Sequence, residues 1–117
     1  MEPSPSRSSR IVVADLLSDK NPQKPVLVDY KGKYEAKFKE DVSTFGGHGY
    51  DALMILTKAI EKGGTDREKV RSAIENMKGF VGTAGVFNLS PADHNGLDID
   101  AFAMLTVKDG RFALLEK

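Results

Sequence analysis

The chain has 117 residues, of which 40% are hydrophobic and 29% charged, a composition typical of one small globular domain. Lys and Arg together number 17, as do Asp and Glu, so no net charge attracts the chain to nucleic acid or to an anionic membrane, and we expect neither as a partner. The absence of cysteine excludes disulfides, zinc–thiolate sites and a catalytic thiol. No apolar stretch approaches the roughly 20 residues that a membrane span needs.

Residues 1–10 are rich in Ser, Pro and Arg, and we expect them to be a disordered leader or a remnant left by cloning. They have no apolar core and do not form a signal peptide, so if the parent protein is exported, its signal is missing from this chain. The apolar run at residues 11–17 follows at once and predicts a buried strand or a covered segment. Because nothing before this run could supply a partner strand, the order indicates a piece of a larger protein.

Two helices are predicted in the first half of the chain. Residues 42–49 separate them and, with three glycines, predict a loop. The first helix spans residues 25–40, where four apolar or aromatic residues recur at offsets of three and four and share one face: Leu27, Tyr30, Tyr34 and Phe38. The second helix is expected over residues 50–62. Apolar side chains cover most of its circumference, so we expect it to be buried on more than one side.

A third helix is predicted after a glycine pair. Gly63 and Gly64 end the second helix, as glycine just beyond a helix commonly does. Residues 65–68 match a capping box, in which Thr65 caps the next helix and the Glu three residues later reaches back. That helix carries an apolar stripe and closes at Gly79; the stripe consists of Val70, Ala73, Ile74 and Met77.

The remainder of the chain is strand-like. Residues 86–89 form a short candidate strand, and apolar residues alternate over residues 99–107 with the period of two of a half-buried strand. The Asp-Gly pair at 109–110 favours a tight hairpin turn, so residues 112–115 are expected to return as a further strand. The glycines within residues 80–85 are interpreted as structural turn residues with positive φ.

Neither histidine is placed for catalysis or metal binding. His48 and His94 lie far apart in sequence, each near a single Asp, whereas a metal site needs three or four ligands that converge. Ser43 and Thr44 precede His48, but no nucleophile-elbow sequence surrounds them. We therefore expect no catalytic residue, no metal and no cofactor, and we do not expect an enzyme.

The glycine-rich residues 46–49 precede a predicted helix, and such a helix N-terminus can bind an anion through free backbone N–H groups. A dinucleotide site needs a strand before G-x-G-x-x-G, and a P-loop needs G-x-x-x-x-G-K-[ST], and this sequence has neither. Two interpretations remain open: a backbone that approaches a ligand closely, or a flexible connection.

Several sequence elements occur together in the order and spacing of one known family. They are a Tyr-Asp-Ala helix at 50–52, an Ala-Ile-x-x-Gly-Gly ending at 59–64, Asp66 followed by Val-Arg-Ser-Ala-Ile-Glu at 70–75, a Gly-x-x-Gly-x-Phe turn at 82–87 and an Asp-His-x-Gly element at 93–96. Over about residues 11–117 the chain resembles the C-terminal stretch of the periplasmic leucine/isoleucine/valine-binding proteins, the substrate-binding subunits of ABC importers.

The resemblance implies an α/β fold, namely the C-terminal fragment of a two-lobed type I periplasmic binding protein, with about three helices, short strands and a C-terminal β-hairpin. In this family two lobes are joined by three chain crossings and hold the solute in the cleft between them. Residues 11–20 would lie near the second crossing, the three helices in the first lobe and the third crossing near residues 101–104. The hairpin of residues 105–115 would end the chain on the second lobe.

The resemblance also implies where a ligand binds. Phe45 matches the aromatic residue just before the Tyr-Asp-Ala helix, which lines the pocket for the ligand side chain. His48 lies on the same predicted loop and is expected to reach the cleft, whereas Tyr50 and Asp51 match positions that we interpret as structural. The family's binders of the ligand α-carboxylate and α-ammonium groups come mainly from parts that this chain does not include.

The implied function is non-catalytic binding of a branched-chain or related amino acid between two lobes, and its delivery to the membrane permease of an ABC importer. The parent protein would be periplasmic, or extracytoplasmic and membrane-anchored. Exposed apolar surfaces predict that the fragment self-associates. Three alternatives remain: a sensor of the same fold for amides or aromatic acids, an unrelated structural or interaction module, and a small hydrolase that uses His48.

Overall fold

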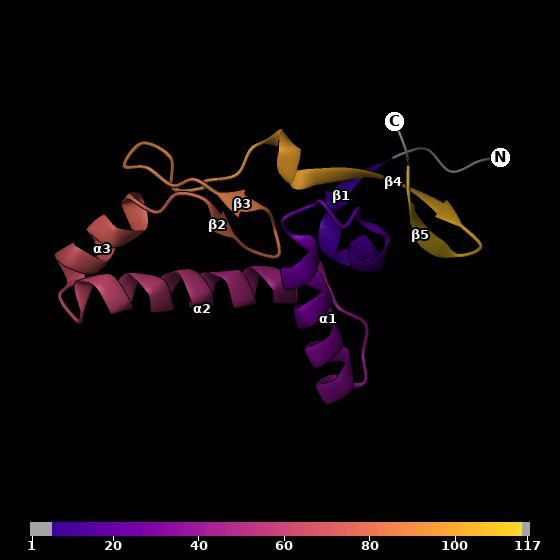
Figure 1. Cartoon of the computed structure of the whole chain (residues 1–117), viewed down its shortest axis with the longest axis horizontal. Coiled ribbons are helices and arrows are strands. Elements are labelled where there is room, and N and C mark those ends of the chain that lie inside the picture. Colours follow the sequence, from indigo (N-terminus) through magenta and orange to yellow (C-terminus); the bar gives the residue numbers. More distant parts are fainter. Residues whose placement is uncertain (1–5, 116–117) are drawn as a thin grey trace.

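The computed structural model describes residues 6–115 (Figure 1). Its α-helices are α1 (Lys24–Phe38), α2 (Thr44–Gly63) and α3 (Arg67–Glu75), and its 3-10 helices are η1 (Arg10–Leu16) and η2 (Ile99–Ala101). One antiparallel sheet has the strand order β1-β4-β5, with β1 at Ser6–Ser9, β4 at Phe102–Lys108 and β5 at Arg111–Leu114. A second, two-stranded sheet pairs β2 (Phe80–Val81) with β3 (Val86–Phe87).

The first described residues are more ordered than the sequence predicts. Strand β1 runs antiparallel to β4 with Ser8 opposite Ala103, and η1 follows it directly, so the expectation of disorder is wrong for residues 6–10. The ladder with β4 satisfies backbone donors and acceptors of this segment, which its Ser-rich composition does not reveal. Residues 1–5, also expected to be disordered, lie outside the described range.

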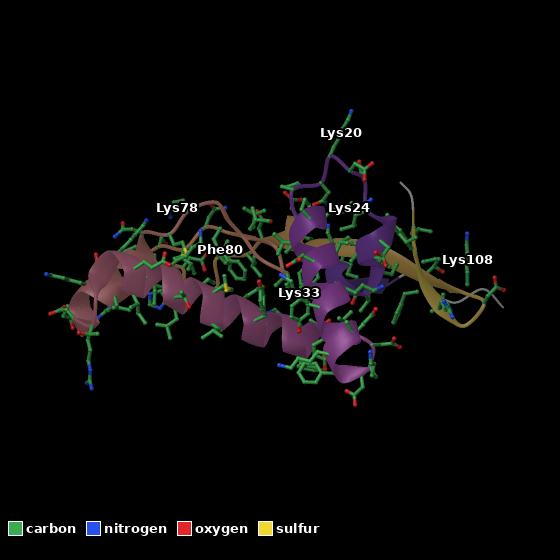
Figure 2. All side chains as sticks on the ribbon, turned by 60° about the horizontal axis from the view of Figure 1, so that its bottom comes forward. Lys20, Lys24, Lys33, Lys78, Phe80 and Lys108 are labelled. Atoms are coloured by element: carbon green, nitrogen blue, oxygen red, sulfur yellow. The ribbon has the colours of Figure 1, made fainter. Side chains whose placement is uncertain are left out.

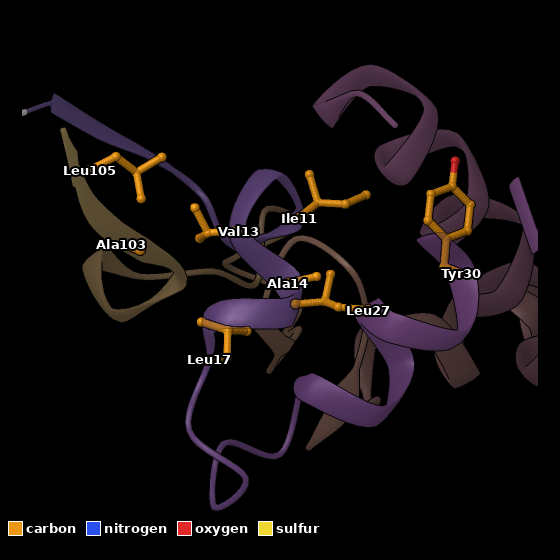
Figure 3. Packing of buried hydrophobic residues seen from close by; sticks show 8 residues of the cluster. All are labelled: Ile11, Val13, Ala14, Leu17, Leu27, Tyr30, Ala103 and Leu105. Carbon is orange, nitrogen blue, oxygen red and sulfur yellow. The ribbon is translucent and has the colours of Figure 1, made fainter. Parts of the chain in front are cut away.

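Residues 11–17 were predicted to form either a buried strand or a covered segment. They form a covered segment, which is a 3-10 helix and not a strand. A short apolar run cannot separate these two structures by its periodicity, because every position except Asp15 is apolar and no polar face is marked. Figure 3 shows the core that this segment forms with α1 and β4. The buried residues of this core are Ile11, Val13, Ala14, Leu17, Leu27, Tyr30, Ala103 and Leu105.

Helix α1 confirms the predicted helical face. Leu27 and Tyr30 are buried on it, Tyr34 is half-buried and Phe38 is exposed. The three aromatic rings form a ladder, with ring centroids 5.8 Å apart for the first pair and 4.8 Å apart for the second. Lys33 and Lys37 are exposed on the rest of the helix surface, and Figure 2 shows Lys20, in the loop before α1, extending away from the ribbon.

The glycine-rich residues 46–49, expected in a loop, belong to α2, which begins at Thr44 and not at Tyr50. Ser43 makes this start possible, because its extended backbone and its hydroxyl cap the helix by accepting from the Gly46 N–H at 3.3 Å. Glycine is a poor helix former, so sequence alone favoured a loop. Gly47 is needed for packing, since a Cβ there would stand 2.6 Å from the Thr83 hydroxyl oxygen.

Helix α2 is buried on one side only. Its buried residues are Gly47, Asp51 and Ala59, whereas Leu53 is 63% exposed, Leu56 42% and Ile60 43%. The expectation of burial on more than one side is therefore wrong for the described chain. Its physical reason is that the β2–β3 turn and α3 cover one side, and no described element covers the other (Figure 1).

The end of α2 is confirmed, and the cap of α3 is corrected. Gly64 ends α2 with φ at 64°, and Gly79 after α3 has φ at 65°. The N-cap of α3 is Asp66 and not Thr65, because the Asp66 carboxylate accepts from the Lys69 N–H at 2.9 Å. Both residue types are good caps, so the sequence could not decide between adjacent positions.

The C-terminal hairpin is confirmed. Asp109 and Gly110 have φ values of 53° and 75°, as the two-residue turn between β4 and β5 requires. The alternating segment at residues 99–107 is only partly strand, because its first three residues form η2 and β4 begins at Phe102. Strand β3 likewise covers two of the four residues expected at 86–89.

Candidate functional site

The two residues predicted to contact a ligand lie at the start of α2. Phe45 is in the first turn and is 88% exposed, and His48 follows three residues later and is also exposed. Helix positions three apart are neighbours on the surface, so both side chains are presented from the same end of α2. An exposed aromatic ring at a fixed helix end can supply apolar contact to a small molecule.

Tyr50 joins this helix end to α1. Its ring lies 4.9 Å from the Tyr30 ring, centroid to centroid, and the Tyr30 hydroxyl closely approaches Gly46. Burial raises the pKa of the Tyr30 hydroxyl, and the nearby Tyr34 and Asp51 act in the same direction, so this hydroxyl is neutral at pH 7. The packing supports the interpretation of Tyr50 as structural.

Asp51 is the buried centre of this region. It is 2% exposed, and its two carboxylate oxygens accept from the backbone N–H groups of Thr83 at 2.7 Å and Ala84 at 2.8 Å. Hydrogen bonds to a charged acceptor are the stronger kind, and these satisfy two donors away from water. A Cβ on Gly82 would stand 2.8 Å from the carboxylate carbon. Gly82 and Gly85 therefore permit close packing and have no positive φ, which corrects the prediction for them.

A second polar side chain reaches the same turn. Gln23, just before α1, is buried, and its amide nitrogen lies within hydrogen-bond distance of the carbonyl oxygens of Gly82 (3.1 Å) and Thr83 (3.2 Å). Its side-chain oxygen accepts from the Arg10 guanidinium at 3.0 Å. In the described part of the chain, no buried side-chain polar atom lacks a partner. Asp51 and Gln23 together fix the start of α2 relative to α1 and the β2–β3 turn.

An open apolar groove lies between the second half of α2 and α3. It has a volume of about 650 Å³, and its apolar lining is contributed by Leu56, Ile60, Val70 and Ile74. Polar groups stand at its edge, where Glu75 Oε1 accepts from Arg71 Nε at 3.1 Å and lies 3.1 Å from His94 Nε2. The Arg71 hydrogen bond holds the pKa of the Glu75 carboxyl below its ordinary value, and His94 adds to this against the opposing effect of burial.

The described residues bring no metal-ligating cluster together. Within residues 6–115, no group of three His, Asp or Glu side chains is placed to hold a metal ion; His48 lies in α2, whereas His94 lies in the loop between β3 and η2. The Ser43 hydroxyl is engaged in capping α2, so it is not held for attack by a neighbouring base. None of the helices in this range is long and apolar enough to cross a bilayer.

Sequence reasoning singled out Phe45 and His48 and interpreted Asp51 as structural, but it missed Gln23 and the groove. Asp51 stands directly before an apolar stretch of the helix, and a carboxylate in such a position can indicate a buried charge that has hydrogen-bond partners. Gln23 gave no such sign, because it stands among loop residues. The groove depends on how α3 folds back along α2, which no local pattern specifies.

Comparison with known proteins shows what this geometry resembles. The family described as periplasmic binding protein matches residues 14–111. An extracellular ligand-binding receptor from Rhodopseudomonas palustris HaA2 has a TM-score of 0.86 and 26% identity, over 96% of this chain and 34% of that chain. A putative branched-chain amino acid ABC transporter from Rhodospirillum rubrum has a TM-score of 0.66 and 28% identity, over 85% of this chain and 27% of that chain.

A leucine binding protein from Thermotoga maritima MSB8 has a TM-score of 0.71 and 24% identity, over 98% of this chain and 30% of that chain, which shows a shared fold. No curated protein matches the chain. The fold and these matches define the class of periplasmic binding proteins. The chain belongs to the periplasmic binding protein family, and it spans about a third of the length of the solved structures that it matches. The expected fold class, a fragment of the type I periplasmic binding protein fold, is thereby confirmed.

Proposed function

We propose that this chain forms the C-terminal segment of the substrate-binding subunit of an ABC importer for branched-chain or related amino acids. Membership of the family supports binding of a small solute. Two similar solved structures are described as a leucine binding protein and a putative branched-chain amino acid ABC transporter, which favours this class of ligand. The observation that carries the proposal is the exposed Phe45 ring at the fixed start of α2.

In this proposal Phe45 supplies apolar contact to the side chain of the amino acid, and His48 stands beside it. Asp51 and Gln23 act by positioning, because they hold the start of α2 against its neighbours. An amino acid carries two charged groups, and each must be partnered when it leaves water. Those partners would come from outside this segment, and closure of two lobes would exclude water from the ligand. Binding would make and break no covalent bond.

The whole protein would work outside the cytoplasmic membrane. We propose that it is periplasmic, or extracytoplasmic and membrane-anchored, and that it presents its ligand to the membrane permease. Residues 101–104 would form a crossing between lobes, and the β4–β5 hairpin would belong to the second lobe. The extended backbone of β4, which continues directly from η2, is compatible with such a crossing.

Calorimetry with leucine tests the ligand site. The chain alone should not bind leucine at micromolar concentration, because one apolar wall cannot offset the desolvation of two charged groups. A hybrid in which residues 6–115 replace the matched segment of the Thermotoga leucine binding protein should bind it. Phe45→Ala in that hybrid should weaken binding by about 1–3 kcal/mol through lost apolar burial.

Phe38→Ala is the matched control, because Phe38 is another exposed phenylalanine, at the end of α1. It should leave leucine binding unchanged. Binding that is equally strong with and without the Phe45 ring would remove Phe45 from the site, and micromolar binding by the chain alone would place the whole site within these residues.

A sensor of the same fold is the second candidate. Its support is that some similar structures are described as extracellular ligand-binding receptors and not as transporters. A sensor for amides or aromatic acids would use the same helix end, so a panel of these ligands in the same calorimetric experiment separates the two candidates.

A further inference from the structure

The loop between β3 and η2 contains a pair of residues that can react with each other. Asn95 is followed directly by Gly96, whereas the other asparagines of the chain precede Pro, Met or Leu. The side-chain amide of an asparagine can be attacked by the backbone nitrogen of the next residue. A following glycine makes this attack easiest, because it has no Cβ to obstruct the approach. The Asn95 side chain is exposed, so water can reach the product of such an attack.

The fold requires glycine at position 96. Gly96 is buried and has a φ of 69°, in the left-handed region that residues with a side chain rarely adopt. A Cβ at this position would stand 2.8 Å from Leu89 Cδ2. The Gly96 carbonyl oxygen also accepts from the Asn88 N–H at 2.8 Å, which joins the loop to the end of β3. The Asn-Gly pair is therefore tied to the way in which this loop folds.

Asp93 binds the nitrogen that would attack. Its Oδ1 accepts from the Gly96 N–H at 3.1 Å and from the Asn95 N–H at 3.0 Å. Asp93 is positioned in turn by Ser90, whose hydroxyl accepts from the Asp93 N–H at 2.9 Å. Aspartate side chains commonly hold turns in this way. The Gly96 nitrogen must lose its proton and turn toward Asn95 before it can attack, and a carboxylate that accepts from its N–H opposes both steps.

We propose that Asn95 is a site of spontaneous deamidation and that Asp93 restrains the reaction while the loop is folded. In the reaction, the Gly96 nitrogen forms a bond to Asn95 Cγ and the bond between Cγ and Nδ2 breaks. Ammonia leaves with the proton that the Gly96 nitrogen gives up. Water then opens the resulting five-membered succinimide at either carbonyl carbon, which leaves aspartate or isoaspartate at position 95.

The products would change the contacts of the loop. The loop reaches the end of α3, where His94 Nε2 lies 3.1 Å from Glu75 Oε1 (Figure 1). Either product places a new carboxylate two residues from Asp93. Isoaspartate also lengthens the backbone by one carbon and shifts Gly96 away from Asn88. Because the reaction proceeds when the loop opens, its extent would record the time that the loop spends open. The inference does not depend on which ligand the protein binds.

Peptide mapping by mass spectrometry tests the proposal, because conversion of an amide to a carboxylic acid changes both the mass and the elution of one peptide. The full chain is incubated at mildly alkaline pH, folded or denatured in guanidinium chloride. Asp93→Ala removes the restraining carboxylate. Asp98→Ala is the matched control, because Asp98 lies at the end of the same loop and accepts from the Asp100 N–H at 2.9 Å and not from Gly96.

Asn95 should deamidate at least about tenfold more slowly in the folded chain than in denaturant, because the folded loop must open first. Asp93→Ala should raise the rate in the folded chain several-fold, and Asp98→Ala should leave it unchanged. Equal rates in the folded and denatured chain would overturn the proposal, as would no reaction at Asn95 in denaturant. Failure of Asp93→Ala to accelerate the reaction, or equal acceleration by both variants, would remove the role of Asp93.

Hydrogen exchange keeps the test valid if circular dichroism shows that Asp93→Ala is unfolded. The Gly96 amide of the unchanged chain should then exchange more slowly in the folded state than in denaturant, because Asp93 holds its proton. Exchange at the same rate in both states would overturn the restraint by Asp93.

Discussion

The two sides of α2 differ in how much of their surface packs against other parts of this chain. On one side, Asp51 is buried and both of its oxygens accept hydrogen bonds from the β2–β3 turn. On the other side, Leu53, Leu56 and Ile60 remain in contact with water. The same 20-residue helix therefore has a buried, fully hydrogen-bonded carboxylate on one side and an exposed apolar surface on the other.

One side of α2 therefore holds contacts that stabilise the fold of this segment. The other side holds apolar surface that remains open to contact with another part of a larger protein. Leaving a buried N–H without an acceptor is costly, so the Asp51 hydrogen bonds must be complete within the segment itself. Leaving an apolar side chain in water costs only about 25 cal/mol per Å² of exposed surface. The segment can therefore fold while these side chains remain exposed. The Asp51 side should therefore control the stability of the free chain, and the side with Leu53, Leu56 and Ile60 should contribute little to it.

Asp51→Ala should have the largest effect on the free chain. Its loss removes two charge-assisted hydrogen bonds and leaves the Thr83 and Ala84 N–H groups buried without acceptors, so the free energy of unfolding should fall by about 3 kcal/mol. Urea unfolding followed by circular dichroism measures it. Asp51→Asn keeps the shape and one acceptor and should lose less. Equal stability of Asp51→Ala and the unchanged chain would show that the hydrogen bonds of Asp51 do not stabilise the fold.

Gly82→Ala should have the next largest effect. The added Cβ would stand 2.8 Å from the Asp51 carboxylate carbon and displace it, at a cost of about 1–3 kcal/mol. Gly32→Ala is the matched control, because nothing lies within 4 Å of a Cβ at Gly32 in α1. That control should stabilise the chain by about 0.5–1 kcal/mol through helix propensity. Urea midpoints moving in the same direction for both variants would contradict the close approach at Gly82.

Asp66→Ala should cost about 1 kcal/mol, the usual value for a helix N-cap. Its carboxylate accepts from the Lys69 N–H, whereas Thr65 makes no such contact in α3. Thr65→Ala should therefore leave the unfolding midpoint nearly unchanged. If Thr65→Ala lowered the thermal unfolding midpoint more than Asp66→Ala does, Thr65 and not Asp66 would be the N-cap.

The Glu75 contacts should give the smallest effect, visible as a dependence on pH. The folded-state pKa of Glu75 is lowered by Arg71 and His94, so its stabilising contribution is present above the unfolded pKa and is lost as pH falls through the folded value. Glu75→Gln should remove this part of the pH dependence. Unfolding measured between about pH 6 and pH 3 checks it, where the difference between the two proteins should narrow toward the acidic end. A constant difference over this range would mean that Glu75 does not titrate with the fold.

Much of the fold follows from local patterns in the sequence. The face of α1, the Gly64 ending and the Asp-Gly hairpin depend on neighbouring residues, and each was predicted correctly. The errors arose where distant contacts override propensity. Residue 47 has to be a glycine because Thr83 lies against it, and β1 forms because β4 passes beside it.

The candidate site was predictable in part. Phe45 and His48 stand out only through the family resemblance, and their role in binding stays a prediction. Asp51 was interpreted as structural through the same resemblance, but its partners lie 32 and 33 residues away and could not be named from the sequence. The groove beside α3 could not be predicted, because it depends on how two helices meet.

Urea unfolding of the free chain, with Asp51→Ala and Leu53→Glu measured side by side, tests the central claim most directly. Leu53 is 63% exposed on the open side of α2, so Leu53→Glu should change the free energy of unfolding by no more than about 0.5 kcal/mol. Asp51→Ala, on the other side of the same helix, should lower it by about 3 kcal/mol. Comparable losses from the two substitutions would contradict the account, because they would show that both sides of α2 are already closed within this chain.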